Sequence, residues 1–214
     1  MKRKILVTEE DLNTKSRILL AAKQEFFEKG FHGASMRSIA ERAGLTTGAI
    51  YNLFENKDFI FKTLIGNTFD ELLAFLVHDS ELEEKQYNMK TSDLSFITEI
   101  SRRKFIKIVD FFYSNWDAMK LLVCCSKGSS YEHIFDKAIR FVEEKTVEWL
   151  KRDNIKVSKQ TKFFIHVMVS TYMEHLKEIF HHDLKKAQAL SYAIDINGYH
   201  CAGWKQYWMS QKEY

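Results

Sequence analysis

Apolar side chains recur every three or four residues along most of the chain, which is the period of an α-helix rather than that of a strand. The first such run comprises Ile18, Leu19, Ala22, Phe26 and Phe27, and Gly30 is expected to end it. Residues 35–57, SMRSIAERAGLTTGAIYNLFENK, then divide at Gly44 into two short helices. We expect Ser35 to cap the first of these and Thr46 or Thr47 to cap the second. This stretch therefore has the layout of a helix-turn-helix.

The rest of the chain also has the helical period. A fourth helix, capped by Asn56, is predicted to run without interruption from Lys57 to Leu76, and the charged residues 78–93 are predicted to form a frayed end and a mobile loop. Further helices are expected over 96–112 and 116–124, from an S-x-x-E capping box at 129–132 to about residue 152, and after Ser158 and Asp183. The fold class predicted is all-α, with about nine helices.

The helix-turn-helix residues carry a family resemblance. The order Ser-Met-Arg-Ser-Ile-Ala-Glu-Arg-Ala-Gly-Leu-Thr-Thr-Gly-Ala-Ile-Tyr-Asn-Leu-Phe, followed at 56–58 by Asn-Lys-Asp, resembles the DNA-binding signature of tetracycline-repressor (TetR) type regulators. The resemblance extends back to Thr14. It implies an N-terminal three-helix DNA-binding domain with a charged tail, residues 1–57, and a larger helical domain for ligand binding and dimerisation, residues 58–214.

We expect the DNA-binding surface to comprise Ser35, Arg37, Thr46, Thr47, Gly48, Ala49, Tyr51, Asn52 and Lys57. By resemblance, Lys57 would bind a backbone phosphate beside a helix N-terminus. Asn52 is a candidate adenine reader, because a carboxamide can bond N6 and N7 of the base together. Many relatives have a second aromatic residue and a histidine where this chain has Asn52 and Leu53. The operator that this chain prefers therefore cannot be copied from those relatives.

Charge is distributed unevenly along the chain. Of 32 Lys and Arg and 29 Asp and Glu, residues 1–65 hold 11 and 8, which leaves 21 of each in residues 66–214. The basic excess therefore lies in the helix-turn-helix third, which suits phosphate contact, although a solvated helix face would explain so small an excess equally well. The three basic residues of the tail, residues 1–12, could contact a minor groove, or the tail could be a disordered terminus.

Several functional classes find no support in the sequence. There is no glycine-rich phosphate loop, no G-x-S-x-G, no H-E-x-x-H and no C-x-x-C, so we expect neither an enzyme nor a cofactor. The adjacent Cys124 and Cys125 are a poor arrangement for a disulfide. No secretory or transmembrane run is evident, and we expect a cytoplasmic protein without membrane contact.

The last two predicted helices indicate a homodimer. The eighth is apolar on more than one side from Phe163 to Met173, and the ninth combines small residues such as Ala202 with the large Trp204 and Trp208. A four-helix bundle from two copies would bury these surfaces, and the alternative is a monomer that buries them in its own core. Two copies would also place two reading helices on a palindromic double-stranded operator.

The predicted function is a sequence-specific transcriptional regulator, a repressor released by a small, mostly apolar effector of unknown identity. Candidate effector-binding residues are Phe112, Tyr113, Trp116, Met119, Phe163, His166 and Tyr172, although aromatic residues at helical spacing can equally fill a core. His175, Glu178 and His182 share a helix face and could bind a metal, but histidines also favour the end of a helix, so we expect no metal site. The alternative function is a DNA-binding protein of the same fold that senses no small molecule.

Overall fold

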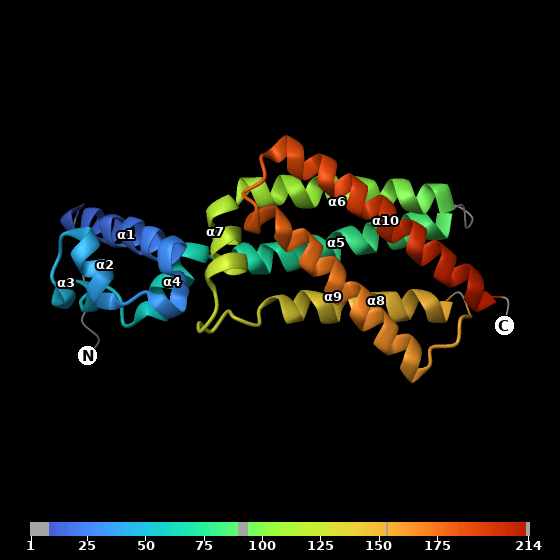
Figure 1. The fold of residues 1–214 in the computed structure, drawn as a ribbon, viewed down its shortest axis with the longest axis horizontal. Helices are drawn as coiled ribbons and strands as arrows, with labels where there is room; N and C mark the ends of the chain where they lie inside the picture. The colour runs from blue at the N-terminus through green and yellow to red at the C-terminus, as the bar shows by residue number, and fades with distance from the viewer. Residues whose placement is uncertain (1–8, 90–93, 153, 213–214) are drawn as a thin grey trace. The chain divides into compact units, whose positions relative to one another are not determined.

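The computed structural model describes residues 9–89, 94–152 and 154–212, and every regular element within them is a helix. Ten α-helices and one π-helix follow one another in chain order (Figure 1). They are α1 (Glu9–Gly33), α2 (Met36–Ala43), α3 (Thr47–Tyr51), α4 (Lys57–Ile65), α5 (Thr68–Met89), α6 (Leu94–Ser114), α7 (Trp116–Lys120), η1 (Leu121–Cys125), α8 (Phe135–Arg152), α9 (Lys159–His181) and α10 (Lys186–Lys212). The all-α prediction is confirmed. Within the described ranges, no helix combines the length and apolar character that a membrane span requires.

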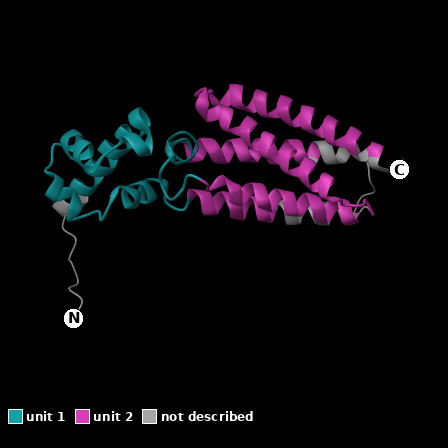
Figure 2. Ribbon diagram, turned by 60° about the horizontal axis from the view of Figure 1, so that its bottom comes forward, with its two compact units in different colours: residues 1–67, 117–132 teal, residues 68–116, 133–214 magenta. Residues whose placement is uncertain are grey.

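The chain divides into two compact units (Figure 2). Unit 1 comprises residues 1–67 together with 117–132, and unit 2 comprises residues 68–116 together with 133–214. The chain therefore passes between the units three times, after residues 67, 116 and 132. The functional division at residue 57 stays a prediction, but the compact unit that contains residues 9–57 also includes α4 and a segment distant in sequence.

Unit 1 is built on α1, which packs against α2, α4 and η1, while α2 packs against α3. Three phenylalanine rings form its centre: Phe26 stacks on Phe31 at 5.8 Å between ring centroids, and both rings meet the edge or face of Phe61 at 5.3 and 5.5 Å. Aromatic pairs at these separations add to the stabilisation from apolar burial. The apolar face predicted for the first helix is therefore confirmed as the side of α1 that packs in the core, where Ile18, Ala22 and Phe26 are fully buried.

Most of the predicted helix ends are confirmed. Ser35 accepts a hydrogen bond from the Ser38 N–H, Asn56 accepts one from the Phe59 N–H, and Ser158 accepts one from the Thr161 N–H. Gly44 ends α2 at φ 64°, a left-handed conformation in which a Cβ is costly. These ends depend on side chains that bond to neighbouring backbone, so the local sequence was sufficient to predict them.

The predicted fourth helix is in fact two helices. It ends at Ile65, Gly66 takes φ 54° and ψ −134°, and α5 begins at Thr68. No helix has those angles, so the chain cannot pass through Gly66 as one rod. The predicted loop over 78–93 is also wrong for most of its length, because α5 continues to Met89; residues 90–93 lie outside the described part of the chain, as do residues 1–8 of the charged tail.

Two predicted helix starts are wrong. At 129–132 the Ser129 hydroxyl accepts from the Tyr131 N–H and the Glu132 carboxylate accepts from the Gly128 N–H, so these side chains close a turn, and α8 begins only at Phe135. Asp183 does not cap α10. It takes a positive φ of 47° after α9, and the Gln188 side chain accepts from the Lys185 N–H instead.

Unit 2 is a bundle of long helices. α10 packs along α6, α8 packs along α9, and α9 also contacts α10 (Figure 1). One of its cores lies at the α8–α9 connection and contains the buried Leu150, Ile155, Ile165 and Val169. The predicted excess of apolar surface on α9 is confirmed, because Phe163 and Val167 remain 68% and 37% exposed within the single chain.

Residues 117–132 form a strap on unit 1. Their apolar side chains Met119, Leu121, Leu122 and Cys125 are buried. At the first end of the strap Lys23 pairs with Asp117 at 2.5 Å, and at the other end Asp58 accepts from the Ser130 N–H and hydroxyl at 2.9 and 2.6 Å. The compact unit that contains the helix-turn-helix is therefore completed by residues that follow it by more than fifty positions.

Candidate nucleic-acid interface

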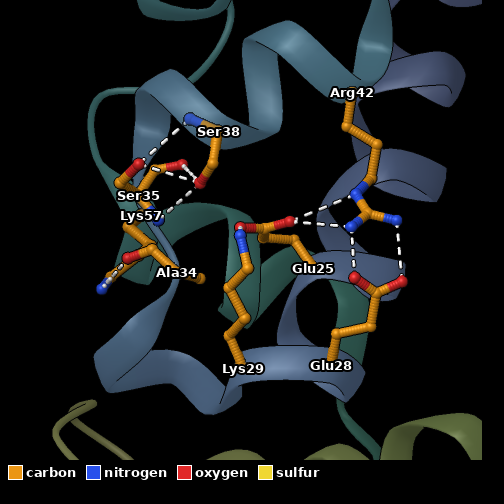
Figure 3. Close-up of polar contacts among 8 residues, drawn as sticks. All are labelled: Glu25, Glu28, Lys29, Ala34, Ser35, Ser38, Arg42 and Lys57. Carbon is orange, nitrogen blue, oxygen red and sulfur yellow. Dashed lines mark hydrogen bonds and ion pairs between the residues drawn. The ribbon is translucent and has the colours of Figure 1, made fainter.

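The helix-turn-helix is fixed at each of its joints. Ser35 and Ser38 form a reciprocal capping box at the start of α2, with 3.0 Å from the Ser38 N–H to the Ser35 hydroxyl (Figure 3). Gly44 turns the chain, and the Thr46 hydroxyl accepts from the Ala49 N–H at 3.2 Å to start α3. Of the two threonines considered from the sequence, Thr46 is thus the cap. These bonds satisfy backbone groups that the ends of short helices leave without partners.

Helix α3 presents one face inward and the other outward. Ile50 is fully buried and Phe54, just beyond the helix, is 1% exposed, so the pair anchors the helix to the core. Tyr51 and Asn52 are exposed, and Thr47 and Ala49 are half-buried. The helix ends at Tyr51, earlier than its apolar pattern predicts, and Asn52 is its C-cap. The predicted base-reading side chains therefore share one short, anchored segment.

A buried carboxylate joins α1 to α2. The Glu25 side chain is 1% exposed, and it accepts from Lys29 at 2.6 Å and from Arg42 at 3.1 Å, while Arg42 also pairs with Glu28 (Figure 3). Burial by itself would raise the pKa of Glu25, but hydrogen bonds from Lys29, Ser38 and Arg42 outweigh it and hold that pKa below its ordinary value. Glu25 therefore stays charged and fixes the angle between the two helices.

Two further basic side chains bind main-chain carbonyls. Arg17 donates from Nη2 to the Ala43 oxygen at 2.8 Å, at the end of α2. Lys57 donates from Nζ to the Phe31 and Ala34 oxygens at 2.5 and 2.7 Å. Partial burial lowers the pKa of Lys57 below its ordinary value. An ammonium carries three N–H donors, so one remains after these bonds, and the predicted phosphate contact of Lys57 stays a prediction.

The basic excess of this region is largely used inside unit 1. Besides Arg17, Arg42 and Lys57, Arg37 pairs with Glu41 at 2.9 Å on the outer face of α2. An exposed ion pair of this kind contributes little stability, so Arg37 can leave Glu41 and bind a DNA phosphate at little cost. Net charge alone therefore overestimated the cations available to DNA, at least over the described residues.

The structure does not bring the seven predicted effector residues together. Phe112, Tyr113 and Trp116 gather around Phe180 in unit 2, with ring centroids 4.9 to 5.1 Å apart, and the Tyr113 hydroxyl donates to the Leu184 oxygen. Three of the others have different surroundings: Phe163 and His166 are exposed on α9, and Tyr172 packs against Phe105. Met119, which follows Trp116 by three positions in α7, is buried within unit 1. His166 bonds Glu143 at 2.7 Å at the surface and does not take part in a core.

The histidines of α9 have separate partners. His182 pairs with Glu178 at 3.0 Å, whereas His175 Nδ1 lies 3.1 Å from Nε2 of the buried His200 on α10. Burial lowers the pKa of His200, and the nearby His175 lowers it further. Among the side chains that the structure describes, no group of three or more His, Cys, Asp or Glu is placed to hold a metal ion.

Sequence reasoning overlooked Glu25, Arg17 and the strap. Glu25 gave a signal, because it follows Ile18 and Ala22 at helical spacing on an otherwise apolar stripe. A charge at such a position is rarely buried without a partner. Arg17 and the strap gave none, since both depend on which distant segments meet.

Comparison with known proteins places this geometry in a family. Residues 18–64 match the family model "Bacterial regulatory proteins, tetR family". The transcriptional repressor BepR of Brucella suis biovar 1 is 47% identical over 57 residues, which are 27% of each chain, and the regulator TtgR of Pseudomonas putida is 35% identical over 77 residues, 36% of each. The chain thus spans about a quarter to a third of the length of the curated relatives that it matches.

Solved structures match over most of the fold. The TetR family regulator PfmR from Thermus thermophilus has a TM-score of 0.56 at 16% identity, covering 87% of this chain and 97% of that one. FadR from Bacillus subtilis, solved with stearoyl-CoA, has a TM-score of 0.54 at 16% identity, covering 88% and 98%. At such identities the likeness shows the fold alone. Residues 18–64 therefore carry a helix-turn-helix domain of the tetR family of bacterial regulatory proteins, within an all-helical fold similar to that of the solved regulators.

Proposed function

We propose that this protein is a sequence-specific DNA-binding transcriptional regulator that acts as a repressor in the cytoplasm. The observation that carries the proposal is helix α3, which exposes Tyr51 and Asn52 while Ile50 and Phe54 anchor it in the core. A rigid short helix with an exposed polar face fits the major groove, where each base pair presents a distinct pattern of donors and acceptors. Thr47, Gly48 and Ala49 would line the same face, and Ser35, Arg37 and Thr46 would meet the backbone.

The working form is proposed to be a homodimer on a palindromic operator. One short reading helix contacts few base pairs, so specificity requires a second half-site about 34 Å away, or a multiple of that distance. Support comes from the outer faces of α9 and α10, where Phe163, Tyr199 and Met209 are 68%, 72% and 49% exposed. Large apolar side chains at such exposure mark a contact surface. The exposed Ala202 and Gly203 of α10 would allow close approach of a partner helix.

Release by a small, mostly apolar effector is the proposed regulation. The aromatic group of Phe112, Tyr113, Trp116 and Phe180 offers an apolar wall together with a tyrosine hydroxyl. Acyl-CoA thioesters belong in a first ligand screen, because a regulator of the same fold was solved with stearoyl-CoA. A ligand that binds the native state raises its melting temperature. A screen without such a rise favours the alternative, a regulator that senses no small molecule.

The proposed function is tested by selection from random double-stranded DNA with the full chain. We expect enrichment of a palindromic sequence. Specific sites are typically bound about 10³- to 10⁷-fold more tightly than random DNA at the same salt concentration. Recovery of unrelated sequences, bound only at low salt, would mean that α3 does not read bases.

A further inference from the structure

Lys57 is directed at the main chain of unit 1. Its Nζ lies 2.5 Å from the Phe31 oxygen and 2.7 Å from the Ala34 oxygen. It also lies 4.2 Å from the centroid of the Phe31 ring. The two carbonyls belong to the connection between Gly30, where α1 breaks at φ 67°, and Ser35, which caps α2. One ammonium group from α4 therefore holds both ends of this connection.

The connection offers the ammonium a favourable site. The last carbonyls of a helix have no N–H partner within the helix, and a charged donor satisfies them well. The ring beneath the ammonium is fixed, since Phe31 is 6% exposed and packs against Phe26 and Phe61. A cation over the face of such a ring is attracted by it. Lys57 is thus held by three contacts from one segment.

The segment that Lys57 holds leads directly into the DNA-binding surface. Ser35 follows Ala34, and its side chain caps α2 together with Ser38 (Figure 3). Helix α2 in turn packs against the reading helix α3. A change at the α1–α2 connection would therefore alter the entry of α2 and the placement of α3, without any contact between Lys57 and DNA.

We propose that Lys57 is a positioning residue, which acts on operator recognition through the α1–α2 connection instead of through a DNA phosphate of its own. This inference rests on the proposed function. It assigns the residue a role other than the one that its place beside a helix N-terminus predicts. A phosphate ligand and a positioning residue differ in two measurable quantities, the dependence of affinity on salt and the ratio of specific to non-specific affinity.

The variant Lys57→Met distinguishes a phosphate ligand from a positioning residue, because it keeps the approximate length of the side chain and removes the charge. A lost phosphate contact in each protomer of the proposed dimer would reduce the slope of log K against log salt by about 1.8, at about 0.9 per contact, and weaken all sequences alike. For a positioning residue we expect an unchanged slope and unchanged affinity for random DNA. Affinity for the selected operator should fall about tenfold to hundredfold, because two charge-assisted bonds that hold α2 are lost. Lys62→Met, at an exposed lysine of the same helix, is the matched control and should change neither quantity.

A slope reduced by about 1.8, with equal losses on operator and random DNA, would overturn the proposal. If Lys57→Met does not fold, Lys57→Arg decides. A guanidinium binds phosphate at least as well as an ammonium does, but its donors form a rigid planar fork that does not reproduce the compact ammonium between the two carbonyls. We expect Lys57→Arg to lose operator affinity while it keeps the wild-type slope; operator affinity equal to wild type would overturn the proposal.

Failure of the proposed function would be visible separately. If the wild-type chain selects no DNA sequence, the regulator assignment fails, and the positioning role is then tested by amide hydrogen exchange. Residues 31–39 should exchange faster in Lys57→Met or Lys57→Arg than in Lys62→Met. Equal exchange in the variants and the control would show that Lys57 does not hold the connection.

Discussion

The two compact units differ in what some of their charged and large apolar side chains do. In unit 1 the charged side chains of Arg17, Glu25 and Lys57 bond to the main chain or to a neighbouring helix. In unit 2 the large apolar side chains Phe163 and Tyr199 turn outward. A small core gains rigidity from specific polar bonds, whereas an exposed apolar face is suited to a partner. This difference fits the proposal that unit 1 holds one geometry and that a second copy of the chain covers α9 and α10 of unit 2.

The largest effect is expected at the outward apolar face of unit 2. Ala202→Glu would place a carboxylate in the proposed dimer interface, and burying an unpaired charge costs several kcal/mol. Analytical ultracentrifugation should show monomers or aggregates in place of dimers. Ala74→Glu makes the same chemical change at an exposed alanine of α5 and should leave the dimer intact. If the Ala202→Glu protein were dimeric, the exposed apolar side chains of unit 2 would not mark the dimer interface.

A smaller effect is expected at the buried carboxylate of unit 1. Glu25→Gln removes a charge that Lys29 and Arg42 bind, and the free energy of unfolding should fall by about 1 to 3 kcal/mol at pH 7. Because the folded state lowers the pKa of Glu25 below 4.5, its contribution is present above that pH and is lost as the pH falls through the folded-state pKa. Urea unfolding should show the difference between wild type and variant narrowing below pH 4.5.

Glu55→Gln, at an exposed position of unit 1, controls for the loss of one negative charge. Its free energy of unfolding should match that of wild type both at pH 7 and below pH 4.5. If Glu25→Gln behaved in the same way, the inward charges of unit 1 would be incidental to its stability.

The smallest effect concerns the buried histidine of unit 2. His200 faces His175 and Tyr172 of α9 and Tyr199 of its own helix, and its pKa lies below 6.5. The unfolded chain therefore binds a proton more readily, so the free energy of unfolding should decrease as the pH falls below 6.5. This decrease should be weaker in His200→Gln and unchanged in the exposed control His133→Gln. An identical pH profile for His200→Gln and wild type would exclude a contribution from the histidine pair.

The features predicted best from the sequence are those that depend on neighbouring residues. The caps Ser35, Asn56 and Ser158 and the turn at Gly44 follow from bonds spanning three or four positions. The break at Gly66 was missed because apolar residues continue at helical spacing on both sides of it. A glycine inside such a pattern is compatible with a helix or with its end, and only tertiary packing decides.

The residues of the proposed functional surfaces could be placed together from the sequence only where one segment carries them. Tyr51 and Asn52 lie together because they share the end of a single short helix. Trp116 and Phe163 were grouped by residue type, but Trp116 packs on Phe180 whereas Phe163 is exposed on α9, because periodicity assigns a residue to a helix face without identifying the helix that it meets. The direction of Lys57 was likewise hidden, since it depends on carbonyls more than twenty positions away.

The central claim, that α3 reads DNA bases, is tested most directly by the sequence preference of Asn52→Ala. Affinities of wild type and variant are measured, at one salt concentration, for the selected operator and for each of its single base-pair changes. We predict that the variant loses discrimination of about 1 to 3 kcal/mol at one position of each half-site and keeps it elsewhere. Gln160→Ala, which removes an exposed amide from α9, should retain the full preference. An Asn52→Ala protein with an unaltered preference at every position would contradict the base-reading role of this helix end.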